Sequence, residues 1–311
     1  MPPEGTGIFL PPGKSIISES AYYKIIKFIG RGGNAIAFKV LCTSGDNHGL
    51  IFALKLQYNL SSEMRQERFF KETKFLKECR HPAILSHIDD GIYELSDGRK
   101  FPFIVTNFLP QTLVDVVRDV EFDFVRKIEI TCQLLSALHF LQAQMILHRD
   151  IKPNNIFMNN NDVFLGDFGL LKKINNTPVD NPDDDIQLLR ESTMADVHNL
   201  TGYKAMPRRY RTPELVRYAN QEDILHIESD VFQLGLVLTE LYTGENPLQE
   251  ADDITSPIRL NKIGPISGTK HGGLVFNQLS GMLKEDYTQR TSVKDLLASF
   301  TGLYQRSTIN C

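Results

Sequence analysis

The sequence lacks the features that mark secreted, membrane-spanning and metal-binding proteins. No apolar run approaches the roughly 20 residues that cross a bilayer, and the start, Met1-Pro2-Pro3-Glu4-Gly5, has no basic region leading into an apolar stretch. No signal peptide or membrane span is therefore expected, and a cytoplasmic location is predicted. The four cysteines are scattered without metal-ligand spacing, which favours reduced thiols in a reducing compartment. They are Cys42, Cys79, Cys132 and Cys311.

An excess of charge of one sign is also missing. The 34 Lys and Arg residues nearly balance the 38 Asp and Glu residues, and the formal net charge is -4. Neither a nucleic-acid partner nor a membrane partner is therefore expected. A small basic cluster, Arg208, Arg209 and Arg211, predicts at most a local anion pocket. The 311 residues suffice for one large domain or two lobes with a sizeable core.

One short stretch concentrates the groups that phosphoryl transfer requires. Asp150, Lys152 and Asn155 lie close together in the chain, and a second acid, Asp167, follows. Asp150 is predicted to accept the proton of an acceptor hydroxyl, and Lys152 to neutralise the transferring phosphoryl group. Asn155 and Asp167 are predicted to hold magnesium between nucleotide phosphates. Such a site works by positioning and by placing positive charge where negative charge collects.

At these residues the chain resembles the eukaryotic-type (Hanks-type) serine/threonine protein kinases. The base loop is followed in order by Gly166-Asp167-Phe168-Gly169 and Thr212-Pro213-Glu214. Lys152, two residues after the base, is the form found in serine/threonine-specific members. The resemblance implies transfer of the γ-phosphoryl group of ATP, with Mg²⁺, to a serine or threonine hydroxyl of a protein substrate.

The resemblance covers roughly Tyr22 to Leu303 and implies an α+β, two-lobed fold. A small lobe of antiparallel strands with one helix is expected at 21–106, a hinge at 107–112 and a larger, mainly helical lobe at 113–303. A lead-in is expected at 1–20 and a tail at 304–311.

A glycine-rich turn between two strand-like runs is predicted to bring backbone N–H groups close to phosphates. The turn contains Gly30, Gly32 and Gly33. It departs from the family pattern, because alanine stands at the third glycine position, Ala35, and at the β-branched position, Ala37. The smaller Ala37 is expected to loosen the cover over adenine.

A strand at 50–56 and a helix at 63–80 are predicted to supply an ion pair. Alternation places Ala53 and Lys55 on one face of the strand. The helix offers Glu67, Glu72 and Glu78, and the residues alone leave all three open as partners of Lys55. The resemblance selects Glu72, which stands nine residues before His81-Pro82.

The resemblance also implies further site residues. Thr106 is expected to be the gatekeeper, and the backbone that follows it is expected to pair with adenine. The complete nucleotide-binding set is Ile29, Gly30, Gly32, Gly33, Ala37, Ala53, Lys55, Thr106, Asn107, Leu109, Asn155 and Asp167. The catalytic set is Asp150, Lys152, Lys55, Glu72 and Arg149.

Control by phosphorylation is predicted from Arg149 and from the long segment that follows Gly169. In the family this arginine grips a phosphate of that segment, so autophosphorylation and self-association are expected. A short helix is predicted at 186–199, and the candidate phosphosites are Ser192, Thr193, Thr201 and Tyr203. Before Glu214 the family usually has a threonine that bonds the base and its lysine, whereas this chain has Pro207, which has no donor.

The helical region offers three further expectations. Apolar spacing predicts a core-packed helix at 124–144, and a nearly all-apolar sequence predicts a buried helix at 231–242. Asp230 is predicted to cap the latter helix, and the resemblance adds hydrogen bonds from the catalytic-loop backbone. Arg290 is expected to pair with Glu214.

Two other classes of function remain open from the sequence. A pseudokinase scaffold is kept open by Ala35, Ala37 and Pro207, although the catalytic residues are all present. A small-molecule kinase would share the base loop, but such enzymes generally lack Phe168-Gly169 and the Pro213-Glu214 pair.

Overall fold

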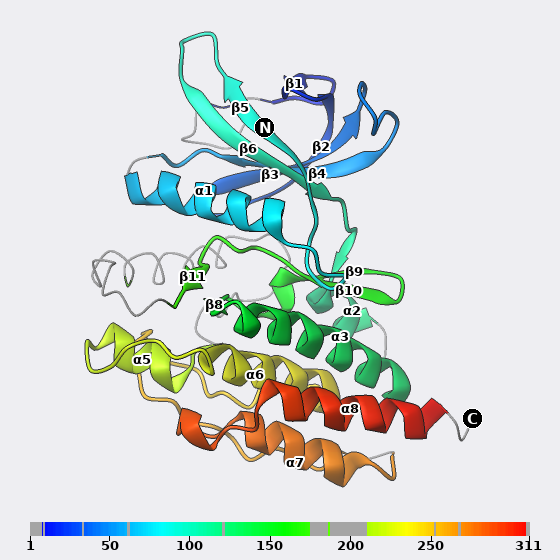
Figure 1. The fold of residues 1–311 in the computed structure, drawn as a ribbon, viewed down its shortest axis with the longest axis vertical. Helices are drawn as coiled ribbons and strands as arrows, with labels where there is room; N and C mark the ends of the chain where they lie inside the picture. Colours follow the sequence, from blue (N-terminus) through cyan, green and yellow to red (C-terminus); the bar gives the residue numbers. More distant parts are fainter. Residues whose placement is uncertain are drawn as a thin grey trace. The chain divides into compact units, whose positions relative to one another are not determined.

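The structure, a computed structural model, describes residues 8, 10–32, 34–60, 63–119, 122–174, 186, 210–251, 253–266 and 269–308. These residues fall into two compact units (Figure 1). Unit 1 contains the described residues up to Arg80 and Leu85–Leu109, and unit 2 contains His81–Ile84 and the described residues from Pro110 onward. The division between Leu109 and Pro110 lies within the segment expected to be a hinge.

Unit 1 is built on a six-stranded antiparallel sheet in the order β1-β2-β3-β4-β6-β5. The strands are β1 (Ser15–Ile17), β2 (Tyr22–Arg31), β3 (Ala35–Cys42), β4 (Ile51–Gln57), β5 (His87–Glu94) and β6 (Lys100–Asn107). The turn at 96–98 joins β5 to β6, and Gly98 adopts a φ of 84° there, which glycine accepts without strain.

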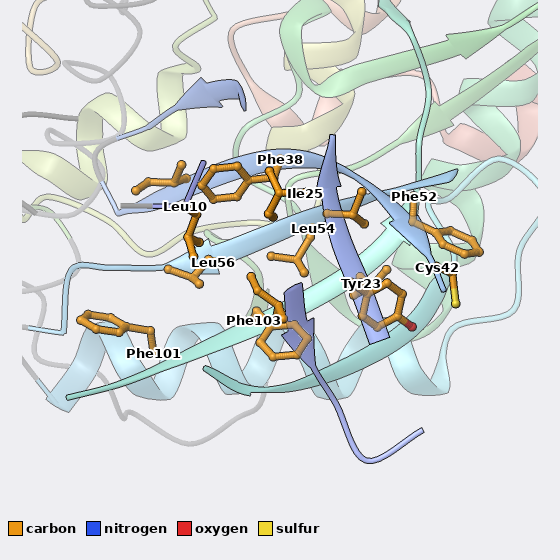
Figure 2. Close-up of a cluster of buried hydrophobic side chains, with 14 of the residues drawn as sticks. Leu10, Tyr23, Ile25, Phe38, Cys42, Phe52, Leu54, Leu56, Phe101 and Phe103 are labelled. Atoms are coloured by element: carbon orange, nitrogen blue, oxygen red, sulfur yellow. The ribbon is translucent and has the colours of Figure 1, made fainter. Parts of the chain in front are cut away.

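Alternation along the strands places one face of this sheet in the core of unit 1. In β3 and β4 every second side chain is buried, because successive side chains of a strand point to opposite faces. Figure 2 shows this core, in which Leu54, Leu56 and Phe103 are completely buried. The other face of β4 carries Ala53 and Lys55, as the alternation predicts.

The segment expected to be a lead-in contributes a strand and core residues. β1 pairs with β2 in the register Ser15↔Lys24, and Ile8, Leu10 and Ile16 are buried in the core of unit 1. The prediction of a separate lead-in at 1–20 therefore missed a part of the sheet. Three residues are too few to give a readable period-two pattern.

A partly buried acid ties the segment after β1 to the far edge of the sheet. The Asp89 carboxylate, on β5, accepts hydrogen bonds from Ser18 Oγ at 2.5 Å, Ser20 Oγ at 2.7 Å and Tyr23 Oη at 2.7 Å. We call these four residues the Asp89 cluster. Burial alone would raise the pKa of Asp89, but these hydrogen bonds and one from the Asp90 amide lower it overall.

Helix α1 (Glu63–Glu78) is the one helix described in unit 1, and it contacts β5. Its buried side chains include Phe69, Glu72, Phe75 and Leu76, which recur at the three-and-four spacing of one helical face. The helix predicted from the sequence ends two residues later, at Arg80.

Unit 2 is mainly helical. Its helices are α2 (Leu113–Asp119), α3 (Phe124–Ala143), η1 (Pro153–Asn155), α5 (Pro213–Ala219), α6 (Ser229–Thr243), α7 (Gly272–Met282), η3 (Tyr287–Gln289) and α8 (Val293–Thr308). Its short strands are β7 (Gln111–Thr112), β8 (Ile146–Leu147), β9 (Ile156–Asn159), β10 (Asp162–Leu165) and β11 (Lys172–Lys173). Helix α3 packs against α8 and α6, and α6 packs against α7 (Figure 1).

The two central helices of unit 2 form where the sequence predicts them. Helix α3 begins after its N-cap, Asp123, whose carboxylate accepts a hydrogen bond from the Arg126 amide at 2.7 Å. The amide of Arg126 lies in the first turn and has no acceptor within the helix, so the cap supplies one. Helix α6 is buried on almost all sides and is capped at its C-terminus by Gly244. Gly244 has a φ of 80°, which glycine adopts without strain because it has no Cβ.

The C-terminal segment differs from the prediction. Helix α8 continues through Thr308, so residues 304–308 are not the expected tail. Tyr304 Oη donates to Glu129 of α3 at 3.0 Å, which fixes this last part of the helix to the unit. The sequence does not predict this end of the helix, because residues 304–308 carry no further apolar repeat.

The fold class is as predicted: a small antiparallel sheet with one helix, and a larger helical unit. Among the described residues, none of the helices combines the length and the apolar character that a membrane crossing demands.

Candidate active site

The base loop follows β8 and contains the predicted catalytic acid. Lys152 Nζ lies 3.0 Å from Asp150 Oδ2, and the Asn155 side-chain amide donates at 2.8 Å both to Asp150 Oδ2 and to the Asp150 carbonyl. The side chain of Lys152 is 9% exposed and that of Asp150 is 15% exposed. The acid therefore has a cation and an amide on one carboxylate oxygen, in a setting that is largely shielded from water.

Asp230 holds the backbone on the N-terminal side of the acid. Its carboxylate accepts hydrogen bonds from the amide of His148 at 2.7 Å and from the amide of Arg149 at 2.9 Å. Burial raises the pKa of Asp230, and the hydrogen bonds from these amides and the charge of Arg149 oppose that rise. The expected N-cap role is wrong, because α6 begins at Ser229 and Glu228 precedes it, so Asp230 lies inside the first turn.

Gln233 holds the backbone on both sides of the acid, and the sequence assigned it no role. Its Oε1 accepts from the Ile151 amide at 3.0 Å, and its Nε2 donates to the carbonyls of Arg149 and Tyr210, each at 3.0 Å. The side chain is buried at 4% exposure. Gln233 is a polar residue in a nearly all-apolar helix, and a buried amide requires hydrogen-bond partners. This pattern in the sequence could have indicated a role for Gln233.

His148 connects the acid to the second carboxylate segment. Its Nε2 lies 3.1 Å from the Gly166 carbonyl, which can only accept, so this nitrogen carries the hydrogen. Its Nδ1 then accepts from the Asp150 amide at 3.3 Å. Complete burial lowers the pKa of His148, which favours this neutral tautomer.

Two residues of the site have backbone angles that non-glycine residues rarely adopt. Arg149 has a φ of 69° and Asp167 a φ of 58°, both in the left-handed region. The Arg149 guanidinium donates from Nε to the Leu170 carbonyl at 2.6 Å. Such conformations persist where surrounding contacts hold them, and they cluster at functional sites.

The predicted magnesium ligands satisfy a simple test of fit. Both hydrogens of the Asn155 amide are used on Asp150, and within the described residues its Oδ1 accepts no hydrogen bond. The Gly166 amide donates to the Asn155 carbonyl at 2.9 Å, which ties Asn155 to the segment of the exposed Asp167. Two oxygen ligands suit Mg²⁺, which usually binds one or two protein groups plus phosphates and water. The described residues contain no larger group of His, Cys, Asp and Glu suited to a metal.

Unit 1 contains the predicted ion pair between strand β4 and helix α1. Lys55 Nζ lies 2.9 Å from Glu72 Oε1 and 3.0 Å from Oε2. The side chain of Lys55 is 30% exposed and that of Glu72 is 5% exposed. Of the competing acids, Glu67 pairs with Lys71 and Glu78 is exposed, so the selection of Glu72 is confirmed.

The glycines of the turn between β2 and β3 also satisfy a test of fit. A Cβ at Gly30 would meet no heavy atom within 4 Å among the described residues, and one at Gly32 would meet only the Ala35 carbonyl at 3.9 Å. Neither residue has a positive φ. Neither backbone strain nor crowding within the described residues therefore requires glycine at these positions. The open space beside them is consistent with room for a ligand. Gly33 lies outside the described residues.

The other predicted nucleotide-binding residues of unit 1 lie on neighbouring strands. Ala37 stands opposite Lys55 in the β3–β4 register, and Ala53 stands opposite Thr106 in the β4–β6 register. Ile29 on β2 is 44% exposed. Asn107 ends β6, and Leu109 follows two residues later. Their contact with a nucleotide remains a prediction.

A family model described as protein kinase domain matches residues 23–300. The chain belongs to the protein kinase family. Among its relatives are probable serine/threonine-protein kinase PknB of Lactococcus lactis, 30% identical over 72% of this chain and 32% of the relative, and a probable serine/threonine-protein kinase of Clostridium acetobutylicum, 26% identical over 91% and 40%. Mitogen-activated protein kinase pmk-3 of Caenorhabditis elegans is 27% identical over 73% and 45%. The chain spans less than half of the length of each of these relatives.

Helix α5 is anchored by the expected pair between Glu214 and Arg290. Arg290 donates to both carboxylate oxygens, at 2.7 and 3.0 Å, and both side chains are almost completely buried. Its remaining donors reach the carbonyls of Lys284, Glu228 and Glu285. The full set of partners explains how this charge is tolerated in the interior.

The basic cluster is not an exposed anion pocket in the part that is described. Arg211 is 1% exposed, and its guanidinium donates to the carbonyls of Asp253 and Ser256. Arg208 and Arg209 lie outside the described residues, as do Pro207, the candidate phosphosites Ser192, Thr193, Thr201 and Tyr203, and the helix expected at 186–199 apart from Ile186.

Proposed function

We propose that this chain is an ATP-dependent serine/threonine protein kinase that transfers the γ-phosphoryl group of Mg-ATP to protein hydroxyls. The observation that carries the proposal is the contact of Lys152 and Asn155 with the carboxylate of Asp150. The family match and the named serine/threonine kinases among the relatives support it.

In the proposed reaction Asp150 orients the acceptor hydroxyl and takes its proton on a carboxylate oxygen. The acceptor oxygen bonds to the γ-phosphorus, and the bond from that phosphorus to the β–γ bridging oxygen breaks, so that ADP leaves. Lys152 lies at the carboxylate and offsets the negative charge that collects on the transferring group. Asp230, Gln233 and Asn155 restrain the loop, so less ordering is needed at the moment of transfer.

Cofactor-binding residues are proposed in each unit separately. Asn155 and Asp167 would hold Mg²⁺, which would supply positive charge to offset the nucleotide phosphates. Lys55, kept in place by Glu72, would bind the phosphates, together with the backbone of Gly30 and Gly32. Ala53, Thr106 and the backbone of 107–109 would take the adenine.

A protein substrate, control by autophosphorylation and a cytoplasmic location are also proposed for this chain. The substrate would be a protein with a serine or threonine acceptor, and the long segment after Gly169 would be a site of autophosphorylation between two associated copies. A cytoplasmic location is supported by free thiols at Cys42, Cys79 and Cys132.

The test is transfer of phosphate from labelled ATP in the presence of Mg²⁺, with wild type beside Asp150→Ala, followed by mapping of the labelled residues. We expect transfer to serine or threonine in the wild type, loss of nearly all transfer in the variant, and equal nucleotide binding by both. Transfer that persists in the variant would show that Asp150 is not the base. Nucleotide binding without transfer in the wild type would instead indicate a pseudokinase scaffold.

A further inference from the structure

The side chain of Gln233 occupies an unusual place beside the catalytic acid. It extends from the buried helix α6 and makes three hydrogen bonds, all to backbone groups and each at 3.0 Å. Two of its partners, the Arg149 carbonyl and the Ile151 amide, belong to the residues immediately before and after Asp150. The third is the Tyr210 carbonyl, two residues before the N-cap of α5, Thr212.

The hydrogen-bonding capacity of the carboxamide matches this arrangement. Both hydrogens of Nε2 are used, and Oε1 accepts from the Ile151 amide. A carboxylate would lack the two donors, a hydroxyl would lack the reach, and an apolar side chain would leave all three groups buried without partners. Gln233 is therefore suited to this place by length and by chemistry.

Asp230 alone would not fix the acid. Its carboxylate holds the amides of His148 and Arg149, both on the N-terminal side of Asp150. Gln233 adds the C-terminal side, through Ile151, and so encloses the Asp150 peptide units from both directions. The positive φ of Arg149 makes this restraint more important, because a strained backbone relaxes when its contacts are lost.

We propose that Gln233 is a positioning residue of phosphoryl transfer: it fixes the backbone on both sides of Asp150 and connects the base loop to the segment that leads into α5. The inference rests on the proposed function, since it concerns the placement of the proposed base. Gln233 acts through Asp150 and does not itself touch substrate.

The experiment compares Gln233→Met, which keeps the size and removes every hydrogen bond, with Gln233→Asn, which keeps the carboxamide and shortens its reach. Thr239→Val is the matched control, because Thr239 is also buried in α6 but donates only within the helix, to the Gly235 carbonyl at 2.8 Å. Thermal unfolding first identifies the variants that remain folded. Gln233→Asn keeps the test available if Gln233→Met does not fold.

The kinetic measurement is rapid-quench determination of the transfer step, with KM for ATP measured in parallel. We expect both Gln233 variants to slow transfer about 10- to 100-fold at an unchanged KM for ATP, because a base displaced by about 1 Å loses rate and not nucleotide affinity. Thr239→Val should retain the wild-type transfer rate. Gln233 variants that are folded and as fast as Thr239→Val would overturn the proposal.

A second measurement does not depend on activity. Amide hydrogen exchange should become about five- to tenfold faster in peptides that cover 148–152 and 210–212 in the Gln233 variants, and not in Thr239→Val. Unchanged exchange would refute the connection whatever the kinetics. If exchange changes as expected but the wild type transfers no phosphate, the proposed function fails and the structural connection made by Gln233 remains.

Discussion

Asn155 uses both hydrogens of its side-chain amide on Asp150, one on the carboxylate and one on the backbone carbonyl. Among the described residues Oδ1 accepts no hydrogen bond and stays available to a metal ion, so the residue that would bind the metal also orients the proposed base. Loss of this one amide should therefore affect two functions together.

Asn155→Ala should raise the Mg²⁺ concentration needed for half-maximal transfer and lower turnover at saturating Mg²⁺ by about 10²-fold, since an oxygen ligand and the hold on Asp150 are both lost. A magnesium titration of transfer measures both effects. Asn154→Ala is the control, because Asn154 is adjacent in η1 and exposed. An unchanged magnesium requirement in Asn155→Ala would exclude this residue as a ligand.

Lys55→Ala should lower turnover by about 10²-fold or more and also destabilise unit 1. The phosphates lose a cation, and Glu72 remains as a buried acid without its partner. Turnover and urea unfolding should be measured together. Lys71→Ala removes an exposed lysine of α1 that pairs with Glu67, and it should leave both quantities near the wild type. Equal effects of the two substitutions would contradict the role assigned to Lys55.

Arg290→Met should lower the free energy of unfolding by about 3 kcal/mol, because the buried Glu214 would lose its nearest cation and keep only the longer 3.5 Å contact with Arg217. Chemical denaturation is the measurement. Arg99→Met is the control, since Arg99 and Asp97 are each half exposed and loss of such a surface pair should leave the free energy of unfolding near that of the wild type. A small loss at Arg290 would mean that the pair is not needed for the fold.

The Asp89 cluster should give stability that depends on pH. The pKa of Asp89 is lowered in the folded chain, so its contribution is present above the unfolded pKa of about 3.9 and is lost as the pH falls through the folded value. Asp89→Asn should therefore cost about 1–2 kcal/mol near pH 7 and progressively less below pH ~4. Unfolding measured across this range tests it, with the exposed Asp46→Asn as control. A cost that is independent of pH would show that the charge of Asp89 contributes nothing.

The parts of the site that sequence predicts well are those that depend on residue type and spacing. The placement of Asp150, Asn155 and Asp167 follows from their order in the chain, and the pair of Lys55 with Glu72 follows from alternation in β4 together with the family resemblance. In each case a side chain could be assigned chemistry without knowledge of the path of the backbone.

The parts that sequence misses depend on long-range backbone contacts. Gln233 reaches the base loop from a helix some 80 residues later, and its partners are backbone groups that no residue type reveals. The N-cap role expected of Asp230 from its position is wrong, and its hydrogen bonds from the loop backbone were expected only from the family resemblance. The positive φ values of Arg149 and Asp167 are likewise imposed by the folded surroundings and not by local preference.

The pairing of β1 with β2 limits where the domain can be truncated. A protein beginning at residue 21 would retain every residue assigned to the chemistry, but β2 would become the edge of the sheet without its hydrogen-bonded neighbour. That edge already carries the exposed apolar side chains Tyr22, Ile26 and Phe28. An unprotected apolar edge strand recruits strands from other molecules, so the shortened protein should aggregate, and β1 is expected to keep the domain soluble.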